Sequence, residues 1–260
     1  MRRVAIGLLT AAALFAQMPA RIPPALQFEV ASLKPSTGQM QGGGIRPAPG
    51  GQKYDAVNCS IKTMITVAYR IKADQIIGGP DWLNSDRYDM QAKAEKPSSP
   101  DELHIMLMNM LVERLNLKFH REKKEMPMYA LTVDTEPRLT PHEAPNAGDV
   151  WIDVSANMLQ VKMKATYAPI DYFAFRLSDF MDRPVVDMTG LHGGYDFNLA
   201  FTRDLPPGFS EGTKINGVEI DTSGPTIYAA VKQQLGLGLK AQRGPVDVIV
   251  IDHADKPTEN

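Results

Sequence analysis

The sequence predicts an α+β protein made of two related halves, at residues 26–135 and 150–260, each with an antiparallel sheet covered by two helices. Two short stretches support this prediction: SDRYDMQAKA (85–94) and HGGYDFNLAF (192–201) both place a Tyr-Asp pair at the head of an alternating run. A Leu-x-Leu phrase also ends a helical pattern in each half, and a proline follows it in both. Landmarks repeated in the same order are typical of internal duplication. The alternative is that any two units of strand, helix and strands share such periodicity.

The helical patterns of the first half have recognisable starts. SIKTMITVAYRI (60–71) begins with Ser60 at its cap position, and SSPDELHIMLMNMLVERLNL (98–117) begins with a capping serine followed by Pro100. Short alternating runs bounded by glycine or proline predict strands. The expected strands are 27–36, 53–58, 75–83 and 87–94, with a glycine-rich loop or loose hairpin at 38–51 and a β-hairpin of KFHREKKE and PMYALTVD at 118–134.

Residues 136–149 are rich in proline and poor in apolar side chains, which predicts a linker between the halves. The order of elements then repeats. The second half is expected to contain strands at 158–165, 183–191 and 195–201, helices at 168–181 and 226–237, a polar excursion at 202–224, and a closing hairpin of GLKAQR with PVDVIVIDHA.

The first twenty residues, MRRVAIGLLTAAALFAQMPA (1–20), have the pattern of a signal peptide. A head of two arginines precedes an apolar run at 4–16, and this run is shorter than the roughly twenty residues that a membrane-spanning helix needs. We therefore expect cleavage after Ala16 or Ala20 and a protein exported to the periplasm or the extracellular space, with no integral membrane segment after cleavage.

Composition excludes some classes of protein. The chain has 28 Lys and Arg against 30 Asp and Glu, a net charge of −2, which argues against nucleic acid as a partner. Cys59 is the single cysteine, so the chain cannot form an internal disulfide. Stability must therefore come from an apolar core.

Five motifs together resemble one family. They are FEVASLKPS, GGPDWLNSDRYDMQAKA, LVERLNLKFHREKKEMPMYAL, RPVVDMTGLHGGYDFNLAF and GPVDVIVIDHADKPTEN, and they span nearly the whole mature chain. This set resembles the soil-associated family of exported bacterial proteins of unassigned function. The resemblance implies export and, in some members, attachment to sensor-type membrane metallopeptidases; it implies no catalytic residue. The motif positions that could serve binding are Trp82, Tyr88, Asp89, Tyr195 and Asp196.

The second half is also similar in pattern to the short periplasmic domains at the amino ends of secretins and TonB-dependent receptors, which bind other proteins.

The repeated Tyr-Asp pair also has a structural explanation. A tyrosine packed over a turn and an aspartate that accepts hydrogen bonds from backbone amides would account for both copies.

A G-x-S-x-G pattern, GFSEG, places Ser210 as a candidate nucleophile, with His253 as base and Asp221 or Asp247 as the third member. A nucleophile elbow requires a buried strand before the serine and a helix directly after it. Here two prolines precede the motif inside the polar excursion 202–224, which favours a solvated loop.

The histidines and methionines indicate neither a metal nor a cofactor. The five histidines lack metal-ligand spacing, and His104 is expected on the polar side of its helix. The methionines are expected to fill the core. Trp82 and Trp151 stand alone in the sequence, so the aromatic platforms of a sugar-binding cleft are not expected.

The sequence favours a non-catalytic, exported binding or sensing module, whose partner is a protein or peptide of the cell envelope bound at a sheet edge or at the loops 38–51 and 202–224. Whether the chain is an enzyme stays open. The sequence contains no recognisable set of catalytic residues, which favours a protein that is not an enzyme. Two alternatives remain: a serine hydrolase or esterase that uses the GFSEG loop, and a structural envelope protein.

The signal-peptide pattern predicts the mass of the mature protein. When the full chain is expressed in a bacterial host with an outer membrane, intact-mass spectrometry should find a product that begins at Gln17 or Arg21 outside the cytoplasm. A product that keeps residues 1–20 would contradict export by this route.

Overall fold

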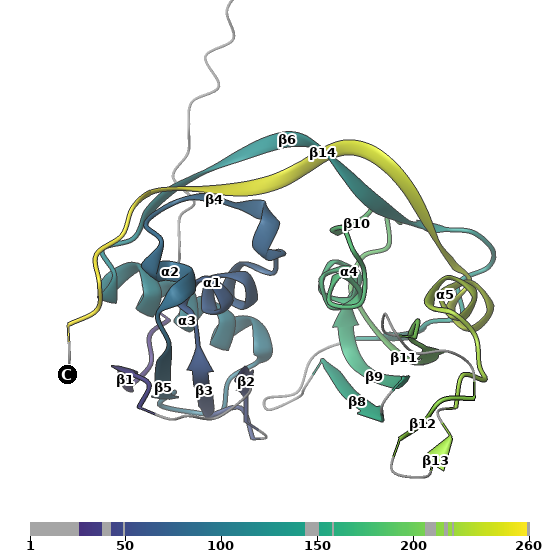
Figure 1. Cartoon of the computed structure of the whole chain (residues 1–260), viewed down its shortest axis with the longest axis horizontal. Coiled ribbons are helices and arrows are strands. Elements are labelled where there is room, and N and C mark those ends of the chain that lie inside the picture. Colours follow the sequence, from purple (N-terminus) through teal and green to yellow (C-terminus); the bar gives the residue numbers. More distant parts are fainter. Residues whose placement is uncertain are drawn as a thin grey trace, which may run out of the picture.

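The computed structural model describes residues 26–37, 43–48, 50–143, 151–157, 159–205, 212–215, 218–219 and 221–258. These residues form two lobes under one long two-stranded arch (Figure 1). The expected signal peptide (1–20) and Ser210 lie outside the described residues. Within the described part, no helix is long and apolar enough to cross a membrane.

The first lobe is an antiparallel sheet with helices packed on one face. Its strands are β1 (Val30–Pro35), β5 (Tyr88–Lys93), β3 (Lys53–Cys59) and β2 (Gly44–Pro47), in that order across the sheet. Its helices are α1 (Ile61–Tyr69), α2 (Trp82–Ser85) and α3 (Pro100–Arg114), with a 3₁₀ turn at Ala73–Gln75.

The starts of α1 and α3 confirm the capping signals in the sequence. The Ser60 hydroxyl accepts a hydrogen bond from the Thr63 amide at 3.1 Å. At α3, the Ser99 hydroxyl accepts from the Glu102 amide while the Glu102 carboxylate accepts from the Ser99 amide. This reciprocal capping box satisfies amides that the first turn of a helix leaves without partners.

The second lobe also combines an antiparallel sheet with helices. Its sheet has the order β7 (Thr140–His142), β11 (Gly194–Thr202), β9 (Gln160–Pro169) and β8 (Ile152–Asn157), all antiparallel. Its helices are α4 (Ile170–Ser178) and α5 (Ile227–Leu235), and a small hairpin of β12 (Lys214–Ile215) and β13 (Val218–Glu219) extends from it.

The arch is a ribbon of two long antiparallel strands, β6 (Lys118–Val133) and β14 (Leu237–His253), called the ribbon below. Each strand is joined in parallel by a short strand near its carboxyl end. β4 (Ile76–Gly78) of the first lobe pairs with β14, and β10 (Val185–Asp187) of the second lobe pairs with β6. The long strand from each half of the chain therefore pairs with a short strand of the other half: β6 pairs with β10, and β14 pairs with β4.

The expectation of a hairpin at 118–134, and of another at the carboxyl end, is wrong. Each segment is one continuous strand, although β6 contains Pro127 and β14 contains Pro245. A proline interrupts a central strand because it has no amide hydrogen to donate. Pro127 and Pro245 lie where the ribbon has two strands only, since β10 pairs with residues 129–131 and β4 with residues 249–251. At these positions each strand has one open side, which tolerates a proline.

The ribbon contributes side chains to both cores. The first core gathers around Tyr54, Met64 and Leu107 and includes Ile249 and Ile251 of β14. The second core includes residues from both ribbon strands. Its most deeply buried members include Leu131, Phe173, Leu199, Phe201, Val231 and Leu237.

The α+β class with antiparallel sheets is confirmed, while three details of the expectation need correction. The first half has a third, short helix, α2, where the sequence predicted the end of a strand. β8 was not expected, and β7 lies inside the segment predicted as a linker. β7 pairs with β11 through Thr140–Asp196 and His142–Gly194, so this part of 136–149 belongs to the second sheet; residues 144–150 are outside the described ranges.

The contribution of β14 to the first core can be measured with Ile249→Ala. Ile249 is 3% exposed, and truncation of such a side chain removes about 2–5 kcal/mol from the free energy of unfolding. Denaturant unfolding of the variant should show this loss. Val57→Ala, at an exposed position of β3, is the control and should change stability by about 0.5 kcal/mol or less. Equal stability of the two variants would mean that β14 does not hold the first lobe.

Candidate functional site

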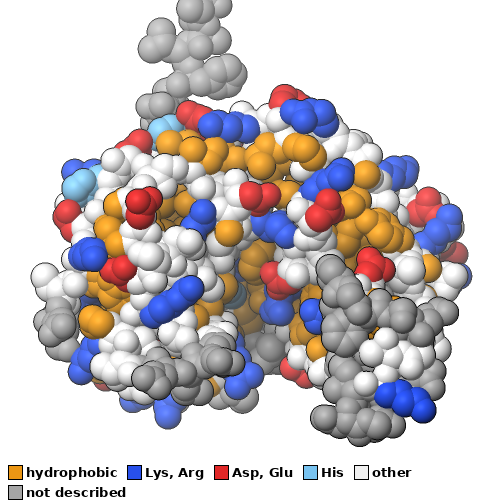
Figure 2. Space-filling model, in the orientation of Figure 1, with side chains coloured by type: hydrophobic (Ala, Val, Ile, Leu, Met, Phe, Trp, Pro, Cys, Tyr) orange, Lys and Arg blue, Asp and Glu red, His pale blue; other side chains and the backbone are white. Residues whose placement is uncertain are grey.

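A pocket of about 470 Å³ lies between the lobes. It is lined by β2, β3, α1, α2 and α3 from the first lobe and by α4 from the second. Figure 2 shows a hollow between the lobes, below the arch, with apolar side chains at its back. The volume falls in the range of about 300–1,000 Å³ that is usual for small-molecule sites.

A cluster of rings is buried beside this pocket, where the two lobes meet. The His104 ring stacks on Trp151 with centroids 6.5 Å apart, and it makes edge contacts of 5.9 Å with both Tyr54 and Tyr172. Trp151 and Tyr172 are also in edge contact at 5.0 Å. Tyr54 and His104 come from the first lobe, while Trp151 and Tyr172 come from the second. The cluster therefore joins the lobes through aromatic packing.

His104 is held as a neutral ring. It is 2% exposed, and its Nδ1 lies 2.6 Å from the carbonyl oxygen of Pro100, one turn earlier in α3. Nδ1 must donate in this bond, so in the neutral ring Nε2 keeps its lone pair. Burial, with smaller effects of the Arg70 and Arg176 charges, lowers the pKa of His104 to about 4. The ring is consequently uncharged at neutral pH.

Arg70, at the end of α1, adds a cation to the same interface. Its guanidinium carbon lies 4.8 Å from the centre of the Trp151 ring and 5.3 Å from that of Tyr172. The guanidinium also pairs with Asp101 of α3 and lies 3.9 Å from Asp171 of α4. Arg70 thus contacts carboxylates on both lobes while it covers the rings of the second.

Lys72 makes a second polar bridge between the lobes. Its ammonium donates to the carbonyl oxygens of Ser178 at 2.8 Å and Met181 at 2.6 Å. These carbonyls belong to the carboxyl end of α4 and the turn after it, where a helix leaves acceptors without partners and favours a positive charge. Lys72 therefore links the end of α1 to the end of α4 along the wall of the pocket.

Two buried donors in the ring cluster have no hydrogen-bond partner among the described residues: the Tyr54 hydroxyl and Trp151 Nε1. A buried polar group without a partner costs about 1–3 kcal/mol. Tyr54 lines the pocket, and burial raises its pKa above the usual range of a phenol, so it keeps its proton. A molecule with an acceptor oxygen that reaches this enclosed hydroxyl from the pocket would satisfy the donor.

The pocket wall is rich in positive charge. Arg46, Lys62, Lys72 and Arg176 line it, against one acidic residue, Asp179. Arg176 Nε lies 3.1 Å from Asp179 Oδ2, so this pair offsets its own charges. The other basic side chains leave a net positive wall in a chain whose overall charge is −2.

The Tyr-Asp pairs that the sequence repeats have structural roles. Asp89 Oδ1 accepts a hydrogen bond from the Asn58 amide at 2.7 Å, and Asp196 Oδ1 accepts from the Tyr167 amide at 2.8 Å. Asn58 and Tyr167 have φ of 50° and 51° and lie just before α1 and α4. Each aspartate therefore holds a residue with positive φ at the passage from strand to helix, which is uncommon for residues other than glycine.

The tyrosines of these pairs, and Trp82, are not among the residues that line the interlobe pocket. Tyr88 is buried in the first core. The Tyr195 hydroxyl donates to the His192 carbonyl at 3.0 Å, so this tyrosine closes the turn that precedes it. Trp82 lies in α2, with the Lys256 ammonium 6.0 Å from its ring centre.

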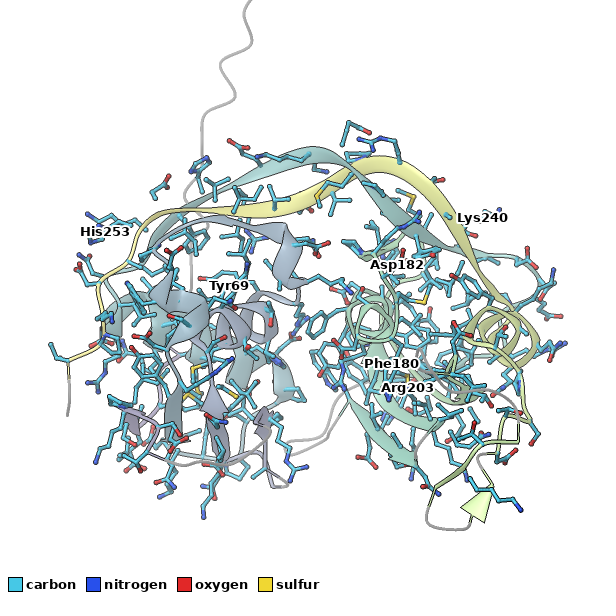
Figure 3. The ribbon with its side chains drawn as sticks, in the orientation of Figure 1. Tyr69, Phe180, Asp182, Arg203, Lys240 and His253 are labelled. Atoms are coloured by element: carbon cyan, nitrogen blue, oxygen red, sulfur yellow. The ribbon has the colours of Figure 1, made fainter. Side chains whose placement is uncertain are left out.

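Ser210 lies outside the described residues, and its candidate partners His253, Asp221 and Asp247 are not grouped together in the part of the chain that the structure describes. His253 lies at the end of β14 over the first lobe, where Nε2 is 3.1 Å from Asp255 Oδ1 (Figure 3). Asp221 belongs to the second lobe and accepts from the Ser223 amide and hydroxyl. Asp247 is in the middle part of β14, and its carbonyl accepts from Gln75. In the ranges that the structure describes, no three His, Cys, Asp or Glu side chains are grouped to hold a metal ion.

Sequence reasoning missed the ring cluster. His104 was expected on the polar side of its helix, and Trp151 was expected to stand alone; both expectations are wrong, since both side chains are buried and their rings contact each other across the lobes. The one local signal was the position of His104, which follows Leu103 and precedes Leu107 at the buried spacing of α3.

By its architecture, this chain is an α+β protein of two lobes with a pocket between them. The comparisons with known proteins show the family to which it belongs. The model of the family described as "Protein of unknown function (DUF3738)" matches residues 62–254, and the chain belongs to this family. No curated protein and no solved structure matches the chain. The expected membership of a family without an assigned function is thereby confirmed, while the similarity to short periplasmic domains stays a prediction.

The low pKa of His104 predicts a dependence of stability on pH. The unfolded chain binds a proton at this histidine below pH 6.5, whereas the folded protein does so only below about pH 4. Its contribution is therefore complete above pH 6.5 and is lost as the pH falls towards 4, by about 1.4 kcal/mol per pH unit. Unfolding free energies of the wild type should fall more steeply in this window than those of His104→Phe.

A direct check is the titration of the His104 ring by NMR in the folded protein. A midpoint near 6.5 would contradict the burial of a neutral ring at the lobe interface.

Proposed function

We propose that this protein is an exported, non-catalytic binding or sensing module that takes its ligand between the two lobes. The observation that carries the proposal is the buried hydroxyl of Tyr54, which lines the interlobe pocket and has no partner among the described residues. Polar contacts between the lobes support it, since Arg70 of the first lobe lies near Asp171 of the second and Lys72 bonds two carbonyls of the second lobe. Concave sites with a few placed polar groups are typical of ligand binding.

The proposed place of action is the periplasm or the extracellular space. The signal-peptide pattern of residues 1–20 supports export. The family resemblance that includes attachment to sensor-type membrane proteins supports a sensing role, in which occupation of the pocket would be passed to a partner in the envelope.

A protein or peptide partner fits the sheet edges. β1 and β8 each end their sheet, and Val30 at the start of β1 is 62% exposed. Backbone amides and carbonyls at such an edge can pair with an added strand. A serine hydrolase based on Ser210 and a structural envelope protein are the alternatives from other classes.

We also infer that the two halves arose by duplication. The reciprocal pairing of β4 with β14 and of β10 with β6 supports this, as do the matching contacts of Asp89 and Asp196. Failure of β3–α1–β4–β5 to superpose on β9–α4–β10–β11 would contradict it.

The pocket can be tested by filling it. Thr66 lies on α1 and lines the pocket, so Thr66→Phe should occupy part of the space without disturbing a core residue. We expect fractions of small molecules from an envelope extract to raise the melting temperature of the mature wild type, because a ligand at about one hundred times its Kd adds about 2.7 kcal/mol. The variant should lose this response.

Gln233→Phe, which adds the same ring at an exposed position of α5, is the matched control and should keep the response. Stabilisation that persists in Thr66→Phe would place the ligand elsewhere. Consumption of a small molecule by the wild type would favour the hydrolase, and the absence of any stabilising fraction would favour the structural alternative.

A further inference from the structure

The interlobe pocket contains two basic side chains that are not committed to other residues. Arg46 on β2 and Lys62 in the first turn of α1 both line it, and neither side chain makes a hydrogen bond or ion pair within the described ranges. The remaining charges are occupied, since Lys72 bonds two carbonyls and Arg176 pairs with Asp179. Within the described part of the chain, the positive charge of the pocket that is not engaged in a hydrogen bond or ion pair therefore lies at Lys62 and at Arg46, which stands opposite Asp55 in the β2–β3 pairing.

The position of Lys62 strengthens this charge. Lys62 and Thr63 belong to the first turn of α1, and both line the pocket. The amino end of a helix carries partial positive charge, which adds to that of a neighbouring ammonium group. Arg46 contributes a planar guanidinium, whose geometry suits the two oxygens of a carboxylate.

An apolar side of the pocket is built from both lobes. Tyr54, Tyr172 and Phe175 line it, with the His104 ring between the two tyrosines. Since the His104 ring is neutral and stacked, it adds an aromatic surface and no charge at neutral pH. The Tyr54 hydroxyl is the one donor of this apolar side that is known to be without a partner in the described chain.

We propose that the pocket selects a small organic anion that carries its charge next to an apolar ring, with the charged group at Arg46 and Lys62 and the ring against Tyr172 and Phe175. This inference rests on the proposed function and names the class of its ligand. The chain as a whole is weakly acidic, so an anion is favoured by this pocket and not by the general surface.

Three probes of the same shape separate charge from ring: 2-naphthoate, 2-naphthylmethanol and 2-naphthylmethylamine. Isothermal titration calorimetry with the mature protein should show that the carboxylate binds at least about tenfold more tightly than the alcohol, while the amine binds most weakly. Raising the salt concentration from about 50 to 500 mM should weaken the binding of the carboxylate and leave the binding of the alcohol unchanged, because salt screens charge.

The double variant Arg46→Gln/Lys62→Gln should bind the carboxylate about tenfold more weakly and the alcohol as the wild type does. Lys53→Gln/Lys123→Gln removes the same charge at exposed positions outside the pocket and is the matched control. It should bind all three probes as the wild type does, and a loss equal to that of the pocket variant would overturn the proposal.

Two further outcomes separate the ligand class from the proposed function. If the alcohol or the amine binds as tightly as the carboxylate and Thr66→Phe abolishes the binding, the pocket is a ligand site and the selection of anions is wrong. If the carboxylate fails to bind at millimolar concentration, the selection of ring-bearing anions is also wrong, and the search for stabilising fractions decides the proposed function independently.

Discussion

The pairing of β6 with β14 is the constraint on which the rest of the structure depends. These strands are the last elements of their respective halves of the sequence, and their register runs from Leu237–Val133 over the second lobe to His253–Lys118 over the first. Because each strand also takes a short parallel partner, β4 or β10, both lobes are attached to the same backbone ladder. The distance between the lobes, and hence the pocket, follows from where this ribbon holds them (Figure 1).

The side chains below the ribbon then decide what the interface can do. Rings alone could hold the two lobes together by packing. This interface also contains cations, and each of them needs a partner. Arg70 finds carboxylates on both lobes and the faces of two rings, and Lys72 finds the carbonyls at the end of α4. Burial is the main reason why His104 is held neutral, and the nearby cations would also repel a charged ring. The pocket opens beside this polar and aromatic contact.

The repeated Tyr-Asp pair is a local sequence motif with a structural role rather than a binding site. Each sheet must pass its chain from a strand into a helix through a residue with positive φ, Asn58 in one lobe and Tyr167 in the other. The aspartate on the neighbouring strand, Asp89 or Asp196, fixes the amide of that residue. In the second lobe this bond and the contact with His142 hold the pKa of Asp196 below its usual range, so the carboxylate stays charged as an acceptor.

The sequence by itself determined the elements whose signals lie within a few residues. The caps at Ser60 and Ser99, the periodicity of the longer helices and several alternating strands, such as β3 and β5, were predictable, because a cap bonds amides of its own first turn and periodicity reports one buried face. The tertiary structure decided the rest. Pro127 and Pro245 looked like turns until the partner strand fixed them in extended backbone, and His104 and Trp151 looked isolated until the ribbon placed one lobe against the other. Such outcomes depend on contacts between residues far apart in the chain, and no local pattern specifies which distant surface a side chain will meet.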